Sequence, residues 1–176
     1  MPEVEKKDYV HVDVYVQGLM RIMSRPDELP KFNGYADDSN DLSELFSKSK
    51  LPEELILFME SMNSKLEHII GMLEHNRMEA GFPIDIEVLN LSANGAIFKS
   101  RSRSLEQGQT VEAVLSLSQV PMIMAGGVGK IKRVEHPSYG QVWELSFTRI
   151  REQDMENIVQ FVFQQERKRI REIRWE

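Results

Sequence analysis

Residues 89–98 read Leu-Asn-Leu-Ser-Ala-Asn-Gly-Ala-Ile-Phe, and this stretch decides the fold of the chain. It predicts a strand that ends in a tight turn, because Asn90 and Ser92 carry short polar side chains that hydrogen-bond their own backbone. Gly95 lets the chain bend without a side-chain clash, and a new strand starts at Ala96. The pattern alone is also that of an ordinary hairpin, so its meaning depends on the sequence around it.

The β pattern extends over much of the chain. In residues 9–16, four valines at every second position alternate with polar or aromatic residues, which predicts a half-buried strand. Further strands are predicted at residues 84–91, 96–102, 111–118, 122–124, 128–134 and 142–147. Short strands separated by turn-rich breaks favour a closed or nearly closed antiparallel barrel.

Residues 52–79 form the strongest predicted helix. Pro52 suits the first helical position, and Glu53 and Glu54 favour the positive end of the helix dipole. Apolar residues recur along this helix at alternating intervals of four and three, which is a heptad repeat. A stripe with this period stays against a partner only if the helices supercoil.

We therefore predict that this helix assembles several copies of the chain. The predicted oligomer interface comprises Leu55, Phe58, Met59, Met62, Leu66, Ile69 and Leu73. Phe58 and Met72 widen the stripe, which suits more than two helices. Two other interpretations stay open: an amphipathic helix packed on its own domain, and a methionine-rich groove for another protein.

A last helix is predicted at residues 152–173, with a basic end at residues 167–174 that meets the negative pole of its dipole. That end could also meet an acidic partner or an anionic surface. We expect one domain over residues 1–176. Its parts are a first strand region at 1–24, a connector at 25–40, inserted helices at 41–80, barrel strands at 81–150 and a C-terminal helix at 151–176.

Composition limits the function further. The net charge of −6 argues against binding to a nucleic-acid polymer, and no apolar run is long enough for membrane insertion. The chain has no cysteine, and its start lacks the apolar run of a secretory signal, so we expect a cytoplasmic bacterial protein.

The order of a strand, the Asn90-x-Ser92-x-x-Gly95 turn, further strands and a final helix resembles a PilZ domain. PilZ domains are receptors, or relatives of receptors, for bacterial cyclic di-GMP. The resemblance implies a mainly β (α+β) fold, with a six-stranded antiparallel β-barrel, an inserted heptad-repeat helix and a C-terminal helix. Residues 55–67 look like the helix of a divergent PilZ subgroup that forms tetramers and in which dinucleotide binding is lost. The resemblance thus implies a homo-oligomer, in this case a tetramer, held by residues 52–79.

In PilZ domains, two arginines in an R-x-x-x-R segment clasp the dinucleotide. The equivalent segment here resembles Lys7 to His11, so both arginines are replaced. Lys keeps a charge but lacks the planar fork of Arg, and Asn90 brings no negative charge to a guanine. If each replacement removes a hydrogen bond of about 1.5–3 kcal/mol, binding weakens by roughly 10² to 10⁴-fold.

We therefore predict a non-enzymatic interaction or scaffold protein in cyclic di-GMP-linked signalling, such as motility, attachment or virulence. It has weak or no dinucleotide binding, no other cofactor and a protein partner that the sequence does not identify. The alternative is a working receptor with a degenerate site. Its candidate residues are Lys6, Lys7, His11, Asn90, Ser92, Gly95, Arg101 and Arg103, where Arg101 or Arg103 replaces a lost arginine on the strand after the turn.

Three other patterns receive ordinary interpretations. The glycine-rich residues 125–130 predict a bulged hairpin, because a phosphate-binding loop needs a helix after its glycines. His68 and His75 lie seven residues apart, about 10 Å along a helix, too far to share a metal ion. A hydrolase is disfavoured because no nucleophile and base have a recognisable spacing, so we expect neither an enzyme nor a metal site.

Overall fold

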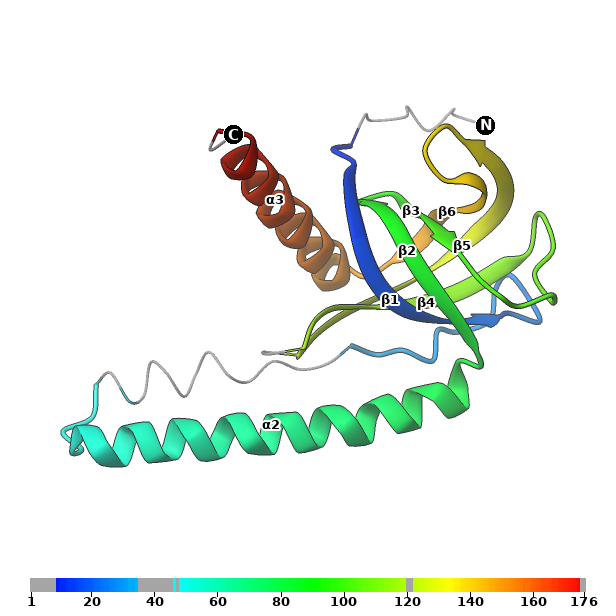
Figure 1. Ribbon diagram of the computed structural model, residues 1–176. Helices are drawn as coiled ribbons and strands as arrows, with labels where there is room; N and C mark the ends of the chain where they lie inside the picture. Colours follow the sequence, from blue (N-terminus) through cyan, green and yellow to red (C-terminus); the bar gives the residue numbers. More distant parts are fainter. Residues whose placement is uncertain (1–8, 35–45, 47, 120–121, 175–176) are drawn as a thin grey trace.

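The computed structural model describes residues 9–34, 46, 48–119 and 122–174, and within them six strands close into a barrel (Figure 1). All neighbouring strands are antiparallel, in the order β1-β2-β3-β6-β5-β4. The strands are β1 (Val12–Ile22), β2 (Ile84–Ser92), β3 (Gly95–Lys99), β4 (Thr110–Gln119), β5 (Met122–His136) and β6 (Gly140–Ile150). The predicted mainly β barrel is confirmed.

The core lies inside the barrel, and one end of it is covered by helix α3 (Glu152–Arg174). Phe98 and Met20 are fully buried in the interior, which shows that the alternating residues of the strands face inward. From α3, Ile158 and Val162 join the same cluster. The amphipathic pattern predicted for residues 152–173 thus serves to pack the helix on the barrel.

Strand boundaries differ from the prediction at several places. β1 continues to Ile22, six residues beyond its predicted end, and β6 spans Gly140–Ile150 instead of 142–147. β1 starts at Val12 instead of residue 9, since Val10 is 47% exposed and precedes the strand. β3 ends at Lys99, so the chain leaves the barrel before residue 102. The predicted hairpin at residues 125–130 is wrong, because these residues lie inside the single strand β5. The register between β5 and β6 shifts between Val128 and Gly129, where Thr148 of β6 is the extra residue.

Gly126 of β5 makes room for a neighbouring side chain and does not form a turn. A Cβ at Gly126 would overlap the ring of Phe32, which is 3% exposed. Phe32 belongs to the predicted connector at residues 25–40, of which the structure describes residues 25–34. Polar contacts also hold these described residues in place. The close approach of Phe32 therefore explains the glycine at position 126.

Glu112 anchors that segment from inside the protein. Its carboxylate is 1% exposed and accepts hydrogen bonds from Arg21 Nε at 2.6 Å and from the backbone N–H groups of Lys31 and Phe32 at 3.0 and 2.8 Å. Arg21, the cross-strand partner of Glu112, also donates to Glu28 at 2.6 Å, which lowers the pKa of Glu28. Burial opposes the charge of Arg21, but its bonds to Glu28 and Glu112 outweigh this and raise its pKa.

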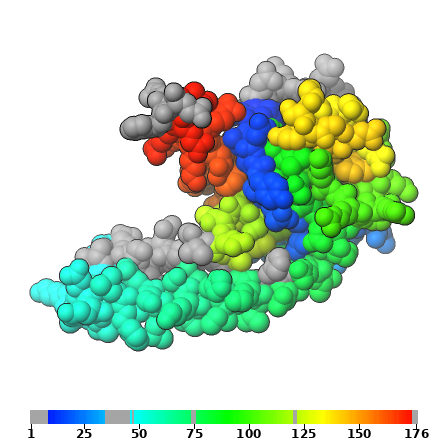
Figure 2. All heavy atoms as spheres, viewed as in Figure 1, coloured from blue at the N-terminus to red at the C-terminus, as the bar shows by residue number. Residues whose placement is uncertain are grey.

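Helix α2 (Glu53–Gly81) is an arm that lies below the barrel and extends beyond it (Figure 2). Pro52 occupies the N-cap position, one residue before the first helical residue Glu53, whereas the sequence predicted Pro52 itself at the first helical position. The helix meets the barrel near its C-terminal end, where Gly71 is buried and a Cβ at that position would lie 2.8 Å from Met122 Cε. The helix ends before Phe82, which is buried beside Leu19 and Val114.

The heptad stripe of α2 faces away from the barrel. Leu73 follows Gly71 by two residues, which places it about 200° around the helix axis from the contact with Met122. The seven predicted interface residues are between 39% and 64% exposed. The interpretation in which this stripe packs on its own domain is therefore wrong, and the stripe is available to other chains.

Candidate functional site

The β2–β3 turn uses its motif residues to hold itself together. Ser92 is fully buried, and its hydroxyl lies 2.5 Å from Asn94 Oδ1 and 3.2 Å from the carbonyl oxygen of Gly95. A Cβ at Gly95 would overlap the carbonyl oxygen of Leu145 on β6. Only glycine therefore allows β3 to approach β6 this closely. Both residues have structural work within the turn.

Asn90 is bound by a neighbour that the sequence analysis did not select. Asp13 is its cross-strand partner on β1, and Asn90 Nδ2 donates to Asp13 Oδ1 at 2.9 Å. The hydroxyl of Tyr139 lies 3.0 Å from the same oxygen and 3.3 Å from the carbonyl oxygen of Leu89. The ring of His136 stacks on Tyr139 at a centroid distance of 4.6 Å. These contacts form one polar cluster at the end of the barrel.

The electrostatics of the cluster centre on an ionised Asp13. The hydrogen bond from Asn90 is the largest cause that lowers the pKa of Asp13, followed by Tyr139, Arg169 and His136, while burial opposes the shift. Burial, and then the bond to Asp13, raise the pKa of Tyr139. The negative carboxylate of Asp13 therefore lies at the side-chain amide of Asn90, the group that the family resemblance assigns to a guanine. A phosphate beside Asn90 would lie close to this negative charge.

The structure does not bring the remaining candidate residues together. Lys6 and Lys7 lie outside the described residues. His11 is exposed and immediately precedes β1, close to Asp13 along the chain. Arg101 and Arg103 are exposed and follow β3, outside any strand.

Arg101 and Arg103 lie toward the opposite end of β2 from Asn90. Ser100 Oγ donates to the carbonyl oxygen of Asp85, which is five residues before Asn90 on β2. Five residues of strand span about 16 Å. The expectation that a strand would place these arginines beside the turn is therefore not met.

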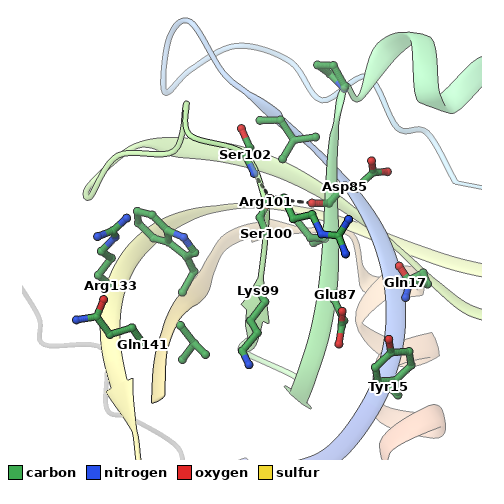
Figure 3. A pocket seen from close by; sticks show the side chains of 15 residues that line it. Tyr15, Gln17, Asp85, Glu87, Lys99, Ser100, Arg101, Ser102, Arg133 and Gln141 are labelled. Atoms are coloured by element: carbon green, nitrogen blue, oxygen red, sulfur yellow. Dashed lines mark hydrogen bonds between the residues drawn. The ribbon is translucent and has the colours of Figure 1, made fainter. Parts of the chain in front are cut away.

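At that other end the barrel surface carries a groove of about 990 Å³ (Figure 3). The groove begins where β3 ends, so β2 and β6 are no longer bridged by a strand. It is lined by the cations Lys99, Arg101 and Arg133 and by the carboxylates of Asp85 and Glu87, and Lys99 and Arg101 lie between Arg133 and these carboxylates. Figure 3 shows Arg133 and Gln141 on one side and Asp85, Glu87 and Tyr15 on the other. The groove can hold a polar ligand that carries both charges or pairs with either side.

Arg133 and Trp143 give the groove an aromatic wall that the sequence analysis missed. They are cross-strand partners on β5 and β6, and the guanidinium carbon of Arg133 lies 5.1 Å from the Trp143 ring centroid. This cation–π contact holds the guanidinium beside the ring, and both side chains line the groove. Neither residue belongs to a motif, so only the strand register could have revealed the pair. Within the described part of the chain, no three His, Cys, Asp or Glu residues could hold a metal ion.

Comparison with known proteins identifies the family. The model of the PilZ domain matches residues 72–164, which are more than half of the 176 residues. The chain belongs to the PilZ domain family. The match includes Asn90, Ser92 and Gly95, and it starts after residues 7–11, which resemble the arginine segment of other PilZ domains.

Two solved structures are similar to this PilZ protein. One is a tetrameric PilZ domain from Xanthomonas campestris that self-assembles through a helical bundle. The two sequences are 15% identical, the TM-score is 0.53, and the comparison covers 93% of this chain and 92% of that chain. The other is the inhibitor of motility MotI/DgrA from Bacillus subtilis, with 11% identity, a TM-score of 0.48 and coverage of 94% of this chain. This chain spans 53% of the length of MotI/DgrA. No curated protein matches the sequence.

Proposed function

We propose that this PilZ protein is a non-enzymatic scaffold in cyclic di-GMP-linked bacterial signalling, with weak or no dinucleotide binding. It assembles through α2 into a homo-oligomer, and its barrels present repeated surfaces to a protein partner. From the family resemblance we infer a role in motility, surface attachment or virulence. The observation that carries the proposal is the exposed heptad stripe of α2 on the side opposite to the barrel.

The stripe supplies enough apolar surface to drive assembly. Its seven interface residues are on average about half exposed in the single chain. Burying the remaining half of such side chains yields about 1 kcal/mol each, hence several kcal/mol per chain before the entropy of association is subtracted. Further exposed residues on α2, among them Ile70 and Met72, widen the stripe beyond a two-helix seam.

The similar fold of the Xanthomonas campestris PilZ domain supports a tetramer. Both chains are covered almost fully in the comparison, so the likeness includes the helical part as well as the barrel. That protein is a tetramer formed by a helical bundle. A parallel arrangement of α2 from four copies would enclose the wide stripe and leave each barrel on the outside.

Weak dinucleotide binding follows from the polar cluster of Asn90. The Asn90 amide is engaged with Asp13, and the Ser92 hydroxyl is buried in its own turn. A nucleotide would have to displace Asp13 from Asn90, and its phosphates would then meet the Asp13 charge. Both effects oppose an anionic ligand, in addition to the loss of the two arginines.

Light scattering on purified protein, with one seam variant and one matched control, tests assembly. Leu66→Asp places a charge in the stripe, so we expect monomers at tens of micromolar protein while the wild type gives an oligomer. Leu57→Asp is the control, because Leu57 is 59% exposed and lies nine residues from Leu66, on the opposite side of the helix. A monomeric wild type, or equal effects of the two variants, would refute assembly through the stripe.

The groove favours the working receptor as a second candidate function. Lys99, Arg101 and Arg133 place three cations around one hollow that an aromatic ring partly lines. Thermal unfolding with and without cyclic di-GMP separates the two functions, since ligand at 100 times its Kd stabilises by about 2.7 kcal/mol. Stabilisation at micromolar cyclic di-GMP that Arg101→Gln abolishes would establish the receptor, and no stabilisation would favour the scaffold.

A further inference from the structure

The distal half of α3 carries an apolar stripe that the barrel does not cover. Phe163, Ile170 and Ile173 are 52%, 46% and 67% exposed. Phe163 and Ile170 are seven residues apart and share one face of the helix. Ile170 lies about 120° around the axis from Ile158, the residue through which α3 packs into the core. Phe163 and Ile170 are thus separate from the face that holds α3 on the barrel, whereas Ile173 lies about 20° from the buried Val162, on that face, and is nevertheless exposed.

Cations border this stripe on the side away from the barrel. Arg167 lies about 40° from Phe163 around the axis and Arg171 about 80°, whereas Lys168 lies on the opposite side of the helix. Arg169 lies about 20° from Ile158, so it faces the barrel, where its charge lowers the pKa of Asp13. In the described part of the chain, Arg167, Lys168 and Arg171 have no ion-pair partner, whereas Arg169 lies 3.9 Å from Glu166. Glu166 falls within the stripe itself, and this contact with Arg169 offsets its charge. The helix end is therefore strongly cationic in a protein whose net charge is −6.

We propose that the distal half of α3 binds the surface of an anionic lipid membrane. An apolar stripe bordered by Arg and Lys is the pattern of helices that lie in the membrane interface, because long basic side chains reach headgroups while apolar residues enter the acyl boundary. On a flat anionic surface, Phe163 and Ile170 can enter the acyl boundary while Arg167 and Arg171, which border them on the side away from the barrel, reach the headgroups. An acidic protein would need an apolar groove for the stripe directly beside its acidic groups.

The geometry of the molecule leaves this surface accessible. In Figure 1, α3 runs upward beside β1, and the side of its distal half that faces away from the barrel is open. Binding would be at the interface only, since no described helix is long and apolar enough to cross a membrane. Each cation near an anionic surface contributes about a fivefold gain in affinity, so the attraction depends strongly on salt.

Co-sedimentation with vesicles tests the proposal on the full chain. We expect the wild type to pellet with vesicles of equal parts phosphatidylglycerol and phosphatidylcholine at low salt, to be released at high salt, and to stay free with phosphatidylcholine alone. Arg167→Gln with Arg171→Gln should weaken binding about 25-fold. Ile173→Ser should also weaken binding without unfolding the protein, since that side chain is 67% exposed.

Matched controls change the same chemistry elsewhere. Arg25→Gln with Lys50→Gln removes two exposed cations outside α3, and Leu57→Ser removes an apolar side chain of similar exposure from α2; both should bind as the wild type does. Absence of binding to the mixed vesicles, or equal binding by the α3 and control variants, would overturn the proposal. Retention on immobilised polyglutamate without vesicle binding would overturn it in favour of an acidic protein. The scaffold is tested by mass alone, so either proposal can fail without the other.

Discussion

Replacing the buried carboxylate of Glu112 should destabilise the protein far more than the same change at Glu28. Both residues bind Arg21 at 2.6 Å, but the side chain of Glu112 is 1% exposed and that of Glu28 is 32% exposed. Glu112→Gln keeps nearly the same shape and removes the charge. The comparison therefore isolates the effect of burial on one ion pair.

The magnitude follows from the contacts of Glu112. Its two oxygens accept three hydrogen bonds, from Arg21 Nε and from the N–H groups of Lys31 and Phe32. In the Gln variant, an NH₂ group must face one of these donors, and Arg21 loses its buried counter-charge. Breaking a buried pair on one side costs about 3–5 kcal/mol. Glu28→Gln should cost clearly less, because water can replace the lost interaction.

Urea unfolding followed by circular dichroism measures both variants at one protomer concentration, because oligomer stability depends on concentration. We expect a large decrease in midpoint for Glu112→Gln and a small one for Glu28→Gln. A double variant, Arg21→Met with Glu112→Leu, removes the unpaired charge but leaves the N–H groups of Lys31 and Phe32 without their acceptor, so it should recover only part of the loss. Equal losses at positions 112 and 28 would refute this account of how residues 23–34 are held.

Three further predictions concern the turn, the polar cluster and the arm. Gly95→Ala should destabilise the barrel by about 1–3 kcal/mol in urea, because its Cβ meets the Leu145 carbonyl, and an unchanged midpoint would contradict that contact. Because the pKa of Asp13 is lowered in the folded protein, its bond to Asn90 stabilises the protein fully above the unfolded-state pKa of Asp13, and this stabilisation is lost as the pH falls through the folded-state pKa. The destabilisation caused by Asn90→Ala should therefore shrink between pH 7 and pH 3. A destabilisation that stays constant over this range would refute the linkage. Gly71→Ala should change stability little, since the flexible end of Met122 can move and Ala favours the helix; a loss above about 2 kcal/mol would show that the contact is rigid.

Local patterns in the sequence were sufficient to predict most of the fold. Periodicity alone reveals the alternating valines of β1 and the heptad stripe of α2, because each pattern repeats every few residues. The turn at Asn90–Gly95 is revealed by its residue types, which lie within six consecutive positions. The hairpin predicted at residues 125–130 failed for the opposite reason. Gly126 is needed because of Phe32, a residue far away in the chain, and glycines that make room look the same in sequence as glycines that turn.

The candidate site was harder to predict because its contacts depend on strand register. Asp13 meets Asn90 across two strands separated by 77 residues in sequence, and Arg21 meets Glu112 across 91. A sequence motif indicates which side chains belong to a turn, but not which neighbour occupies them. Ser92 shows the same limit, since the motif predicted a polar side chain at the turn without revealing that its hydroxyl is buried.

The two faces of α2 separate what holds the protein together from what it offers to others. One face touches Met122 through Gly71, and the other consists of the exposed stripe. The groove is lined by barrel residues and by none of α2, so substitutions in the groove should leave the exposed stripe of α2 unchanged. If the stripe assembles copies of the chain as proposed, a lineage can change the surface that the barrel offers to a partner and keep the same assembly.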